Sequence, residues 1–142
     1  MKPTGIIIHH SLTKDGKTAD WDAIKRYHMT DPKHMWSDIG YHAGVERING
    51  VLTSLTGRPI NQTGAHCVGH NDTIGICIVG NFDLAAPDNE LLRYAAALVA
   101  GYLRMFELPV ASIHKHHDYA AKSCPGSQFP WPQFIALVQE AL

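Results

Sequence analysis

Short apolar runs along the chain mark the positions of buried strands. Residues 6–10 are Ile-Ile-Ile-His-His, a β-branched run that predicts a strand ending in two histidines with side chains on opposite faces. Residues 73–80, Thr-Ile-Gly-Ile-Cys-Ile-Val-Gly, are apolar on both faces, which is typical of a central strand covered on each side. The first run therefore predicts a buried strand, and the second predicts the middle of the sheet.

Helical spacing of apolar residues predicts three helices. Residues 20–30 suit a short helix that begins at an Asp20 cap and stops at an Asp-Pro pair. The longest apolar repeat begins after Asp88 and continues until Pro109, as expected of an amphipathic helix packed on a sheet. Apolar residues at helical spacing return in residues 131–142 and predict a terminal helix.

A hairpin and one further strand complete the expected elements. Residues 41–53 contain Asn49-Gly50 between two strand-like runs, which indicates a type I′ turn. A short strand is expected near residues 110–113, before a histidine-rich loop. Strands mixed with helices, without repeats, predict an α/β fold with a central mixed sheet and helices on both faces. The length suits a single domain, here residues 1–142.

The overall composition argues against nucleic-acid binding and against membrane insertion. The formal net charge of -1 and the sequence pI near 6.8 leave no broad basic surface for nucleic acid. No run approaches the roughly 20 apolar residues of a membrane span, and the first five residues lack the apolar core of a signal peptide. We therefore expect a protein made in the cytoplasm without a signal peptide.

Histidine and cysteine usage indicates a site rather than a disulfide framework. The chain has ten histidines against twelve lysines plus arginines, and histidine is the commonest metal ligand in proteins. Three cysteines are an odd number in a chain without an export signal, so at least one thiol is free. Cys67 and Cys77 have no evident activating partner and are expected to be inert thiols.

One set of residues has the chemistry of a catalytic zinc site. Such a site needs three protein ligands drawn from imidazole, thiolate and carboxylate, and one open position for water. His9, His116 and Cys124 supply that set, and Cys124 follows His116 at a spacing that lets a loop fold back onto the end of the first strand. The pattern alone leaves the identity of the ligands open, and the alternatives are His10, His114 and His117.

Five short motifs, in matching order and spacing, resemble those of the zinc-dependent N-acetylmuramoyl-L-alanine amidases of the phage T7 lysozyme and peptidoglycan recognition protein type. The motifs are Ile7-Ile8-His9-His10-Ser11, Asp38-Ile39-Gly40-Tyr41-His42, Gly57-Arg58 with Gly64-Ala65-His66, residues 74–80, and His116-His117-Asp118 with Lys122-Ser123-Cys124-Pro125. Together they span nearly the whole chain, which is far more specific than any one motif. The resemblance implies an α/β domain with zinc at one end of the sheet.

The resemblance also implies a role for each residue in the site. It places one Zn²⁺ per chain on His9, His116 and Cys124, and it implies that Tyr41 and Lys122 are catalytic. Two neutral imidazoles and one thiolate leave the zinc site with a net positive charge, which favours hydroxide on the open position near neutral pH. Lys122 would stabilise the oxyanion formed from the amide, and Tyr41 would orient the attacking water or relay its proton.

Four further residues are candidates for contact with substrate. His66 resembles a groove-lining position of the family, and Arg58 and Asn71 are polar groups able to bind carbohydrate or a peptide carboxylate. Trp36 precedes the Tyr41 loop and is the tryptophan best placed to line a groove. Exposed polar residues are commonly only surface, and tryptophans are commonly core or rim, so these four rest on weaker grounds than the ligands.

Four other histidines are expected to lie outside the metal site. The sequence favours a hydrogen-bonded role for His10 on the opposite strand face, and a solvated or structural role for His28 and His34. His42 would point away from Tyr41 in an extended segment, where it could still support a ligand from behind.

The resemblance implies hydrolysis of the amide between the lactyl group of N-acetylmuramic acid and L-alanine of peptidoglycan. A chain without a signal or an appended wall-binding domain is similar to a phage or prophage endolysin that stays in the cytoplasm until a holin releases it. The alternatives are a non-catalytic peptidoglycan-binding module and a cytosolic muropeptide-recycling amidase. Receptors of this type typically lack the zinc cysteine and the recycling branch has aspartate there, so Cys124 favours the lytic enzyme.

Overall fold

The computed structural model describes residues 1–13 and 21–142, so the predicted Asp20 cap lies outside the described residues. In chain order the elements are β1 (Ile6–His10), α1 (Trp21–Thr30), β2 (Ala43–Ile48), β3 (Val51–Thr56), β4 (Ile74–Ile78), α2 (Asn89–Phe106), the 3-10 turn η1 (Val110–Ser112), β5 (Ile113–Lys115), the 3-10 turn η2 (His116–Asp118) and α3 (Trp131–Ala141). All three predicted helices are present.

The five strands form one mixed sheet in the order β3-β2-β4-β1-β5. Strand β1 runs parallel to β4 and β5, β2 runs parallel to β4, and β3 pairs antiparallel with β2. The two apolar runs of the sequence are therefore neighbouring inner strands, and every residue of β1 and β4 is buried. The predicted α/β fold with a central mixed sheet is confirmed.

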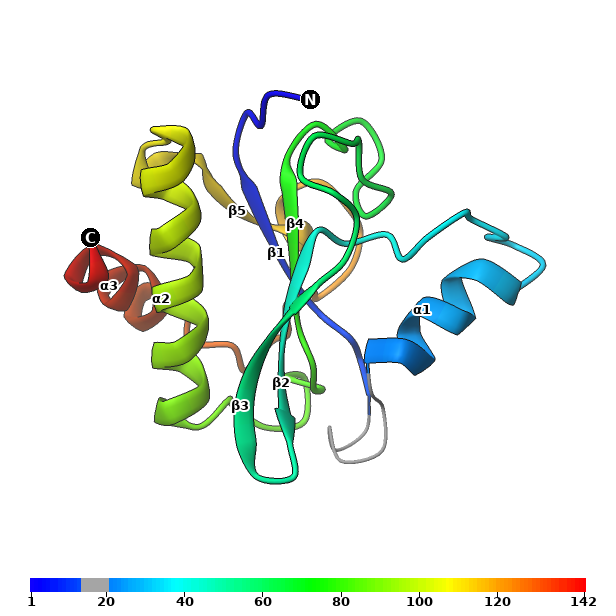
Figure 1. Cartoon of the computed structure of the whole chain (residues 1–142). Coiled ribbons are helices and arrows are strands. Elements are labelled where there is room, and N and C mark those ends of the chain that lie inside the picture. The colour runs from blue at the N-terminus through cyan, green and yellow to red at the C-terminus, as the bar shows by residue number, and fades with distance from the viewer. Residues whose placement is uncertain (14–20) are drawn as a thin grey trace.

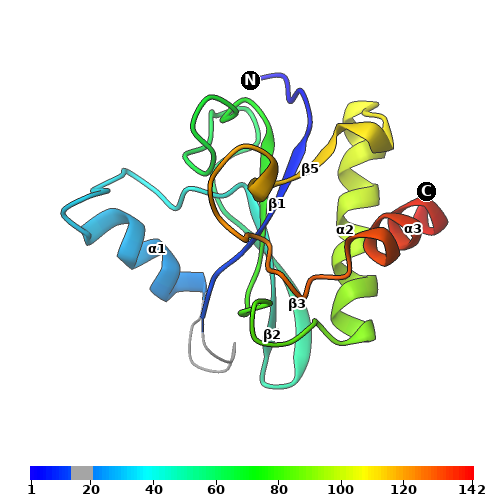
Figure 2. The same cartoon turned by 180° about the vertical axis from the view of Figure 1, so that it is seen from behind.

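Alternation of side chains along the strands divides the core between the two faces of the sheet. On one face Ile6, Ile8 and the isoleucines of β4 join α2 and α3 in the main hydrophobic cluster. A smaller cluster joins Trp21, at the start of α1, to Cys77 and Val79. Figures 1 and 2 show α2 and α3 on one side of the sheet and α1 on the other. Helices thus cover both faces, as predicted.

Local signals explain the ends of the longest helix. Asp88 is the N-cap of α2, and its side chain accepts a hydrogen bond from the backbone N–H of Leu91 at 2.9 Å. The helix ends at Phe106, and Glu107 follows in the left-handed conformation with φ 53°, two residues before Pro109.

Within the described part of the chain, no helix combines the length and the apolar character needed to cross a membrane.

The hairpin forms where Asn49-Gly50 predicts it. These two residues join β2 to β3, and their φ angles are 50° and 79°. Positive φ at both central positions is the signature of a type I′ turn, whose twist matches that of the flanking strands. The second strand continues to Thr56, beyond the predicted limit, because it pairs with β2 in unbroken register from Ala43 to Ile48.

The strand predicted near residues 110–113 is wrong in position. Most of that segment is the turn η1, and strand β5 begins only at Ile113. The backbone N–H and the hydroxyl of Ser112 both donate to the carbonyl of Pro109, at 3.0 and 2.7 Å. These local hydrogen bonds offer the backbone an alternative to the sheet. Pairing with Ile6 of β1 therefore begins after the turn.

Candidate metal centre

The strand register brings two histidines from distant parts of the sequence together. His9 lies near the carboxyl end of β1, and His116 follows the last residue of β5. Because Ile8 pairs with Lys115 in parallel register, the next residues on the two strands are His9 and His116. The centroids of their rings lie 4.5 Å apart. Carboxyl ends of parallel strands are the usual place for binding sites in open α/β sheets.

The loop between η2 and α3 carries Cys124, and several hydrogen bonds fix its path. The carbonyl of Cys124 accepts a hydrogen bond from the N–H of His117 at 2.8 Å. Asp83, after β4, accepts from the hydroxyl of Ser123 and from the N–H of Ser127, both at 2.8 Å. These bonds lower the pKa of Asp83. The loop lies over the end of β1, as the spacing in the sequence suggests.

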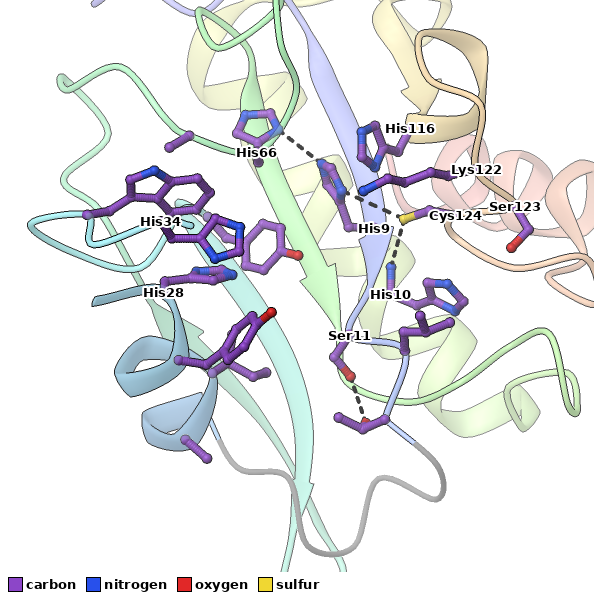
Figure 3. Close-up of a pocket in the computed structure, with 18 of the residues that line it drawn as sticks. His9, His10, Ser11, His28, His34, His66, His116, Lys122, Ser123 and Cys124 are labelled. Carbon is purple, nitrogen blue, oxygen red and sulfur yellow. Dashed lines mark hydrogen bonds between the residues drawn. The ribbon is translucent and has the colours of Figure 1, made fainter. Parts of the chain in front are cut away.

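His9, His116 and Cys124 form a compact group of potential metal ligands (Figure 3). One ligand atom from each lies within 4.8 Å of the others. The sulfur of Cys124 lies 3.7 Å from Nδ1 of His9 and accepts a hydrogen bond from the backbone N–H of His10 at 3.4 Å. In residues 1–13 and 21–142, no other group of three His, Cys, Asp or Glu side chains is close enough to bind a metal ion.

Burial sets the protonation of these ligands. It lowers the pKa of His9 well below the ordinary value, and burial together with Lys122 lowers the pKa of His116. Both rings are therefore neutral at neutral pH, with a lone pair available. Burial raises the pKa of Cys124 to about 11, although the His10 N–H and Lys122 favour the thiolate. A bound cation reverses this preference, because a metal ion deprotonates a coordinating thiol.

Two further polar side chains lie beside the ligands without belonging to the group. Lys122 lies two residues before Cys124 and lines the same cavity (Figure 3). The ring of Tyr41 also lines it, with its centroid 5.1 Å from that of His9. Burial, and then Cys77, raises the pKa of Tyr41 well above the ordinary value. Its hydroxyl therefore keeps its proton at neutral pH and is able to donate a hydrogen bond.

The three ligand candidates line a cavity of about 790 Å³. Figure 3 shows His28 and His34 on the wall formed by α1 and the segment after it, across the cavity from His9. The other residues of this wall are Ala23, Ile24, Tyr27 and Trp36. A cavity of this size, lined by aromatic rings and a few polar groups, suits a small ligand or one segment of a polymer.

His28 and His34 line the cavity, although the sequence pattern gives them only a solvated or structural role. The structural role is confirmed for His28, because its Nδ1 accepts a hydrogen bond from the N–H of Gly40 at 3.0 Å and burial lowers its pKa to about 4. The helical spacing of Ile24, Tyr27 and His28 was the available signal of a shared face. The sequence does not show where this shared face points, because that depends on how α1 packs on the sheet.

The predicted substrate-contact residues fall into two pairs. Trp36 and His66 line the cavity, whereas Arg58 and Asn71 do not belong to its lining. Arg58 donates from Nε to the carbonyl of Ile39 at 2.7 Å and from Nη1 to a second carbonyl. The side-chain oxygen of Asn71 accepts two backbone N–H groups. Both therefore support the loops around the cavity, and direct contact with substrate stays a prediction for all four residues.

The alternative histidine ligands lie outside the metal group. His10 lines the cavity, but its Nδ1 is engaged by the backbone N–H of Phe82 at 3.1 Å, in agreement with the predicted hydrogen-bonded role. His117 donates from Nδ1 to the carbonyl of Lys122, and His114 packs against a tyrosine ring. His42 is also engaged, because its Nδ1 accepts the N–H of Gly75 at 3.1 Å. The geometry therefore leaves His10, His114 and His117 outside the group of potential metal ligands, which consists of His9, His116 and Cys124.

The fold and the site together define a class of protein. A sheet of mainly parallel strands presents two histidines and a cysteine to a cavity at one end, and three such ligands are the set that a catalytic metal ion needs. The sequence profile of N-acetylmuramoyl-L-alanine amidase matches residues 1–127. The chain therefore belongs to the N-acetylmuramoyl-L-alanine amidase family.

Individual relatives agree with the family assignment. The chain is 31% identical to the endolysin of Enterobacteria phage K11 over 122 residues, which cover 83% of this chain and 77% of the endolysin. It is 30% identical to a human N-acetylmuramoyl-L-alanine amidase over an alignment that covers 96% of this chain but 26% of the human protein. The amidase LysC from Clostridium intestinale URNW has the same fold, with a TM-score of 0.81 and 24% identity over 98% of this chain and 87% of LysC.

Proposed function

We propose that this chain hydrolyses the amide bond between the lactyl group of N-acetylmuramic acid and L-alanine in bacterial peptidoglycan, with one zinc ion bound by His9, His116 and Cys124. One observation carries the proposal. In a member of the N-acetylmuramoyl-L-alanine amidase family, these three side chains come from separate segments and converge within 4.8 Å at a cavity.

The donor set suits zinc in a catalytic rather than a structural site. Structural zinc is usually enclosed by four protein ligands, whereas catalytic zinc has three and keeps a position for water or substrate. The group has two imidazoles and one thiol, and all three side chains lie buried at the lining of the cavity, so a fourth position on the cavity side is left for water or substrate. When bound there, zinc supplies Lewis acidity and lowers the pKa of a bound water.

Lys122 has the charge and the location to stabilise the reaction's developing negative charge. It is the one lysine or arginine among the described residues that line the cavity. Negative charge appears on the amide oxygen when the carbonyl carbon is attacked, and a fixed ammonium in a partly water-excluded site stabilises it.

Tyr41 has a complementary role in positioning. Since burial keeps its hydroxyl protonated at neutral pH, the hydroxyl orients the attacking water or a polar group of the substrate as a hydrogen-bond donor. On the opposite wall, Trp36 offers an apolar face for the glycan or the stem peptide.

The biological role that best suits this activity is that of an endolysin. The similarity to the endolysin of phage K11 supports a protein that cuts the wall from within, after a holin lets it leave the cytoplasm.

Digestion of purified peptidoglycan tests the proposal. We expect free stem peptides with a new L-alanine amino terminus, no new reducing sugar ends, and no reaction in the presence of a chelator. Mass spectrometry with end-group labelling distinguishes these products. A glycosidase of the usual kind needs two carboxylates around the sugar bond. A rise in reducing ends without new alanine amino groups would therefore refute the amidase proposal, and binding without cleavage would indicate a receptor-like module.

A further inference from the structure

His66 lies next to the candidate metal group, and other groups of the protein engage both of its ring nitrogens. Its Nε2 lies 3.1 Å from the carbonyl oxygen of Thr73, and its Nδ1 lies 3.0 Å from Nε2 of His9. The His66 and His9 rings meet edge-on, with their centroids 5.0 Å apart. His66 as a whole is only 9% exposed. Its imidazole therefore has no nitrogen left to bind a substrate.

Thr73, His66 and His9 are linked in a row by these contacts, and the Thr73 carbonyl at one end determines which ring nitrogens carry the protons. A carbonyl oxygen only accepts, so Nε2 of His66 carries the hydrogen. The ring is buried and has no carboxylate among its described hydrogen-bond partners, so it is neutral and its Nδ1 holds a lone pair. That nitrogen accepts the N–H of His9 Nε2. The lone pair of His9 is then on Nδ1, the atom 3.7 Å from the sulfur of Cys124.

We propose that His66 is a positioning residue of the metal centre, which selects the tautomer of His9 with Nδ1 free to bind zinc and holds that ring in place. Metal-bound histidines commonly donate their second N–H to a neighbouring acceptor, which fixes tautomer and orientation. The inference rests on the zinc site of the proposed function. It gives His66 a different role from the substrate contact that the sequence suggests.

The surroundings of His66 leave room for its ring and little else. A Cβ added to Gly75 would lie 2.5 Å from Cγ of His66, and one added to Gly64 would lie 2.5 Å from Cδ2. The side-chain oxygen of Asn71 accepts the backbone N–H groups of His66 and Cys67 at 2.8 and 2.9 Å. Two glycines and one asparagine thus determine where this imidazole lies.

Proton–nitrogen correlation NMR of the metal-free protein tests the tautomer directly. We expect both His9 and His66 to carry their proton on Nε2 in the wild-type chain. In His66→Leu, His9 loses its acceptor, and a population with the proton on Nδ1 should appear. A wild-type His9 protonated on Nδ1, or a His9 whose tautomer does not respond to His66→Leu, overturns the proposal.

Zinc affinity, measured by competition with a chromophoric chelator, gives a second readout. We expect His66→Leu to weaken zinc binding about 10- to 100-fold, the usual effect of removing a partner of a metal-bound histidine. His66→Asn places an amide oxygen near the former Nδ1 position and should restore most of the affinity. Equal affinities for the Leu and Asn variants contradict the proposed role.

His42→Asn is the matched control for general loosening of the site. His42 is 1% exposed and its ring lies near that of His66, but its nitrogens contact Gly75 and Gln62 rather than a metal ligand. It should keep the zinc affinity of the wild type, and a loss as large as that of His66→Leu counts against positioning. If the wild-type chain binds no zinc, the proposed function fails, whereas the NMR spectra still decide whether His66 selects the tautomer of His9.

Discussion

Lys122 and Tyr41 line the cavity but contribute no atom to the group of three ligands. We expect Lys122→Ala and Tyr41→Phe each to keep zinc and to lower kcat/KM on peptidoglycan by at least about 100-fold, the usual loss when an oxyanion donor or a proton-transfer group is removed. Metal analysis and the release of stem peptides measure the two properties separately.

Matched substitutions elsewhere in the chain control for these changes. Tyr102→Phe removes a hydroxyl from α2, where the ring stacks on Phe106, and Lys33→Ala removes an exposed charge after α1. Neither residue lines the cavity, so both variants should keep zinc and activity. Near-normal turnover of Lys122→Ala and Tyr41→Phe would show that the two residues are only neighbours of the metal, and loss of zinc from either would indicate a structural role.

At the scale of elements, Asp88 connects the start of α2 to strand β2. Its carboxylate accepts the N–H of Leu91 at 2.9 Å and a hydrogen bond from Arg47 at 2.8 Å. We expect Asp88→Ala to lower the free energy of unfolding by about 0.5–2 kcal/mol, the usual value of an N-cap, as measured by urea denaturation. Peptidoglycan hydrolysis per folded molecule should not change, because Asp88 lies outside the cavity lining.

Asp88→Asn separates the contribution of the helix cap to stability from that of the ion pair with Arg47. Asparagine is as good an N-cap as aspartate, so this variant retains the cap and loses only the charge that faces Arg47. The two side chains are 54% and 33% exposed, and an ion pair of this kind contributes about 0–1 kcal/mol. An Asn variant as unstable as the Ala variant would assign the effect to the ion pair instead.

The elements that the sequence predicts best are those with complete local signals. The strand at Ile6–His10, the helix after Asp88 and the Asn49-Gly50 turn each carry their own apolar pattern, cap or positive-φ residues. The start of β5 is harder to predict from the sequence. Residues 110–113 have apolar and β-branched members suited to a strand, but the hydrogen bonds of Ser112 close a turn first.

For the molecule as a whole, the proposed zinc ion would link metal content to stability, because a ligand that binds only the folded chain stabilises the fold. A ligand at 100 times its Kd adds about 2.7 kcal/mol to the folded state. That corresponds to roughly 10 °C in Tm for a chain of this size. We expect a chelator to lower the Tm of the wild type by about this amount, and Cys124→Ala to contain no zinc and to unfold at one temperature with or without the chelator. Calorimetry and metal analysis measure both.

His10→Ala is the control for this experiment. His10 is next to a ligand in the sequence and lines the cavity, but it does not belong to the ligand group, its Nδ1 accepts the N–H of Phe82, and the backbone N–H that contacts Cys124 remains after the change. The variant should therefore contain about one zinc per chain and respond to the chelator like the wild type. Full zinc content in Cys124→Ala would remove this cysteine from the ligand set.

The sequence by itself determined the strands and helices with strong local patterns, and the residue types available for a metal site. Backbone preferences, caps and burial patterns act over a few residues, so they are visible in the chain before it folds. The resemblance to known amidases narrowed the ligands further, but neither source explains how they meet.

Only the tertiary structure decided which side chains come together and which atoms they present. His9 and His116 are neighbours because Ile8 pairs with Lys115, and that register arises between segments far apart in the sequence. The lone pair on Nδ1 of His9 depends, through His66, on a backbone carbonyl. Every residue has such a carbonyl, so no pattern of side chains in the sequence marks the one that accepts this hydrogen bond.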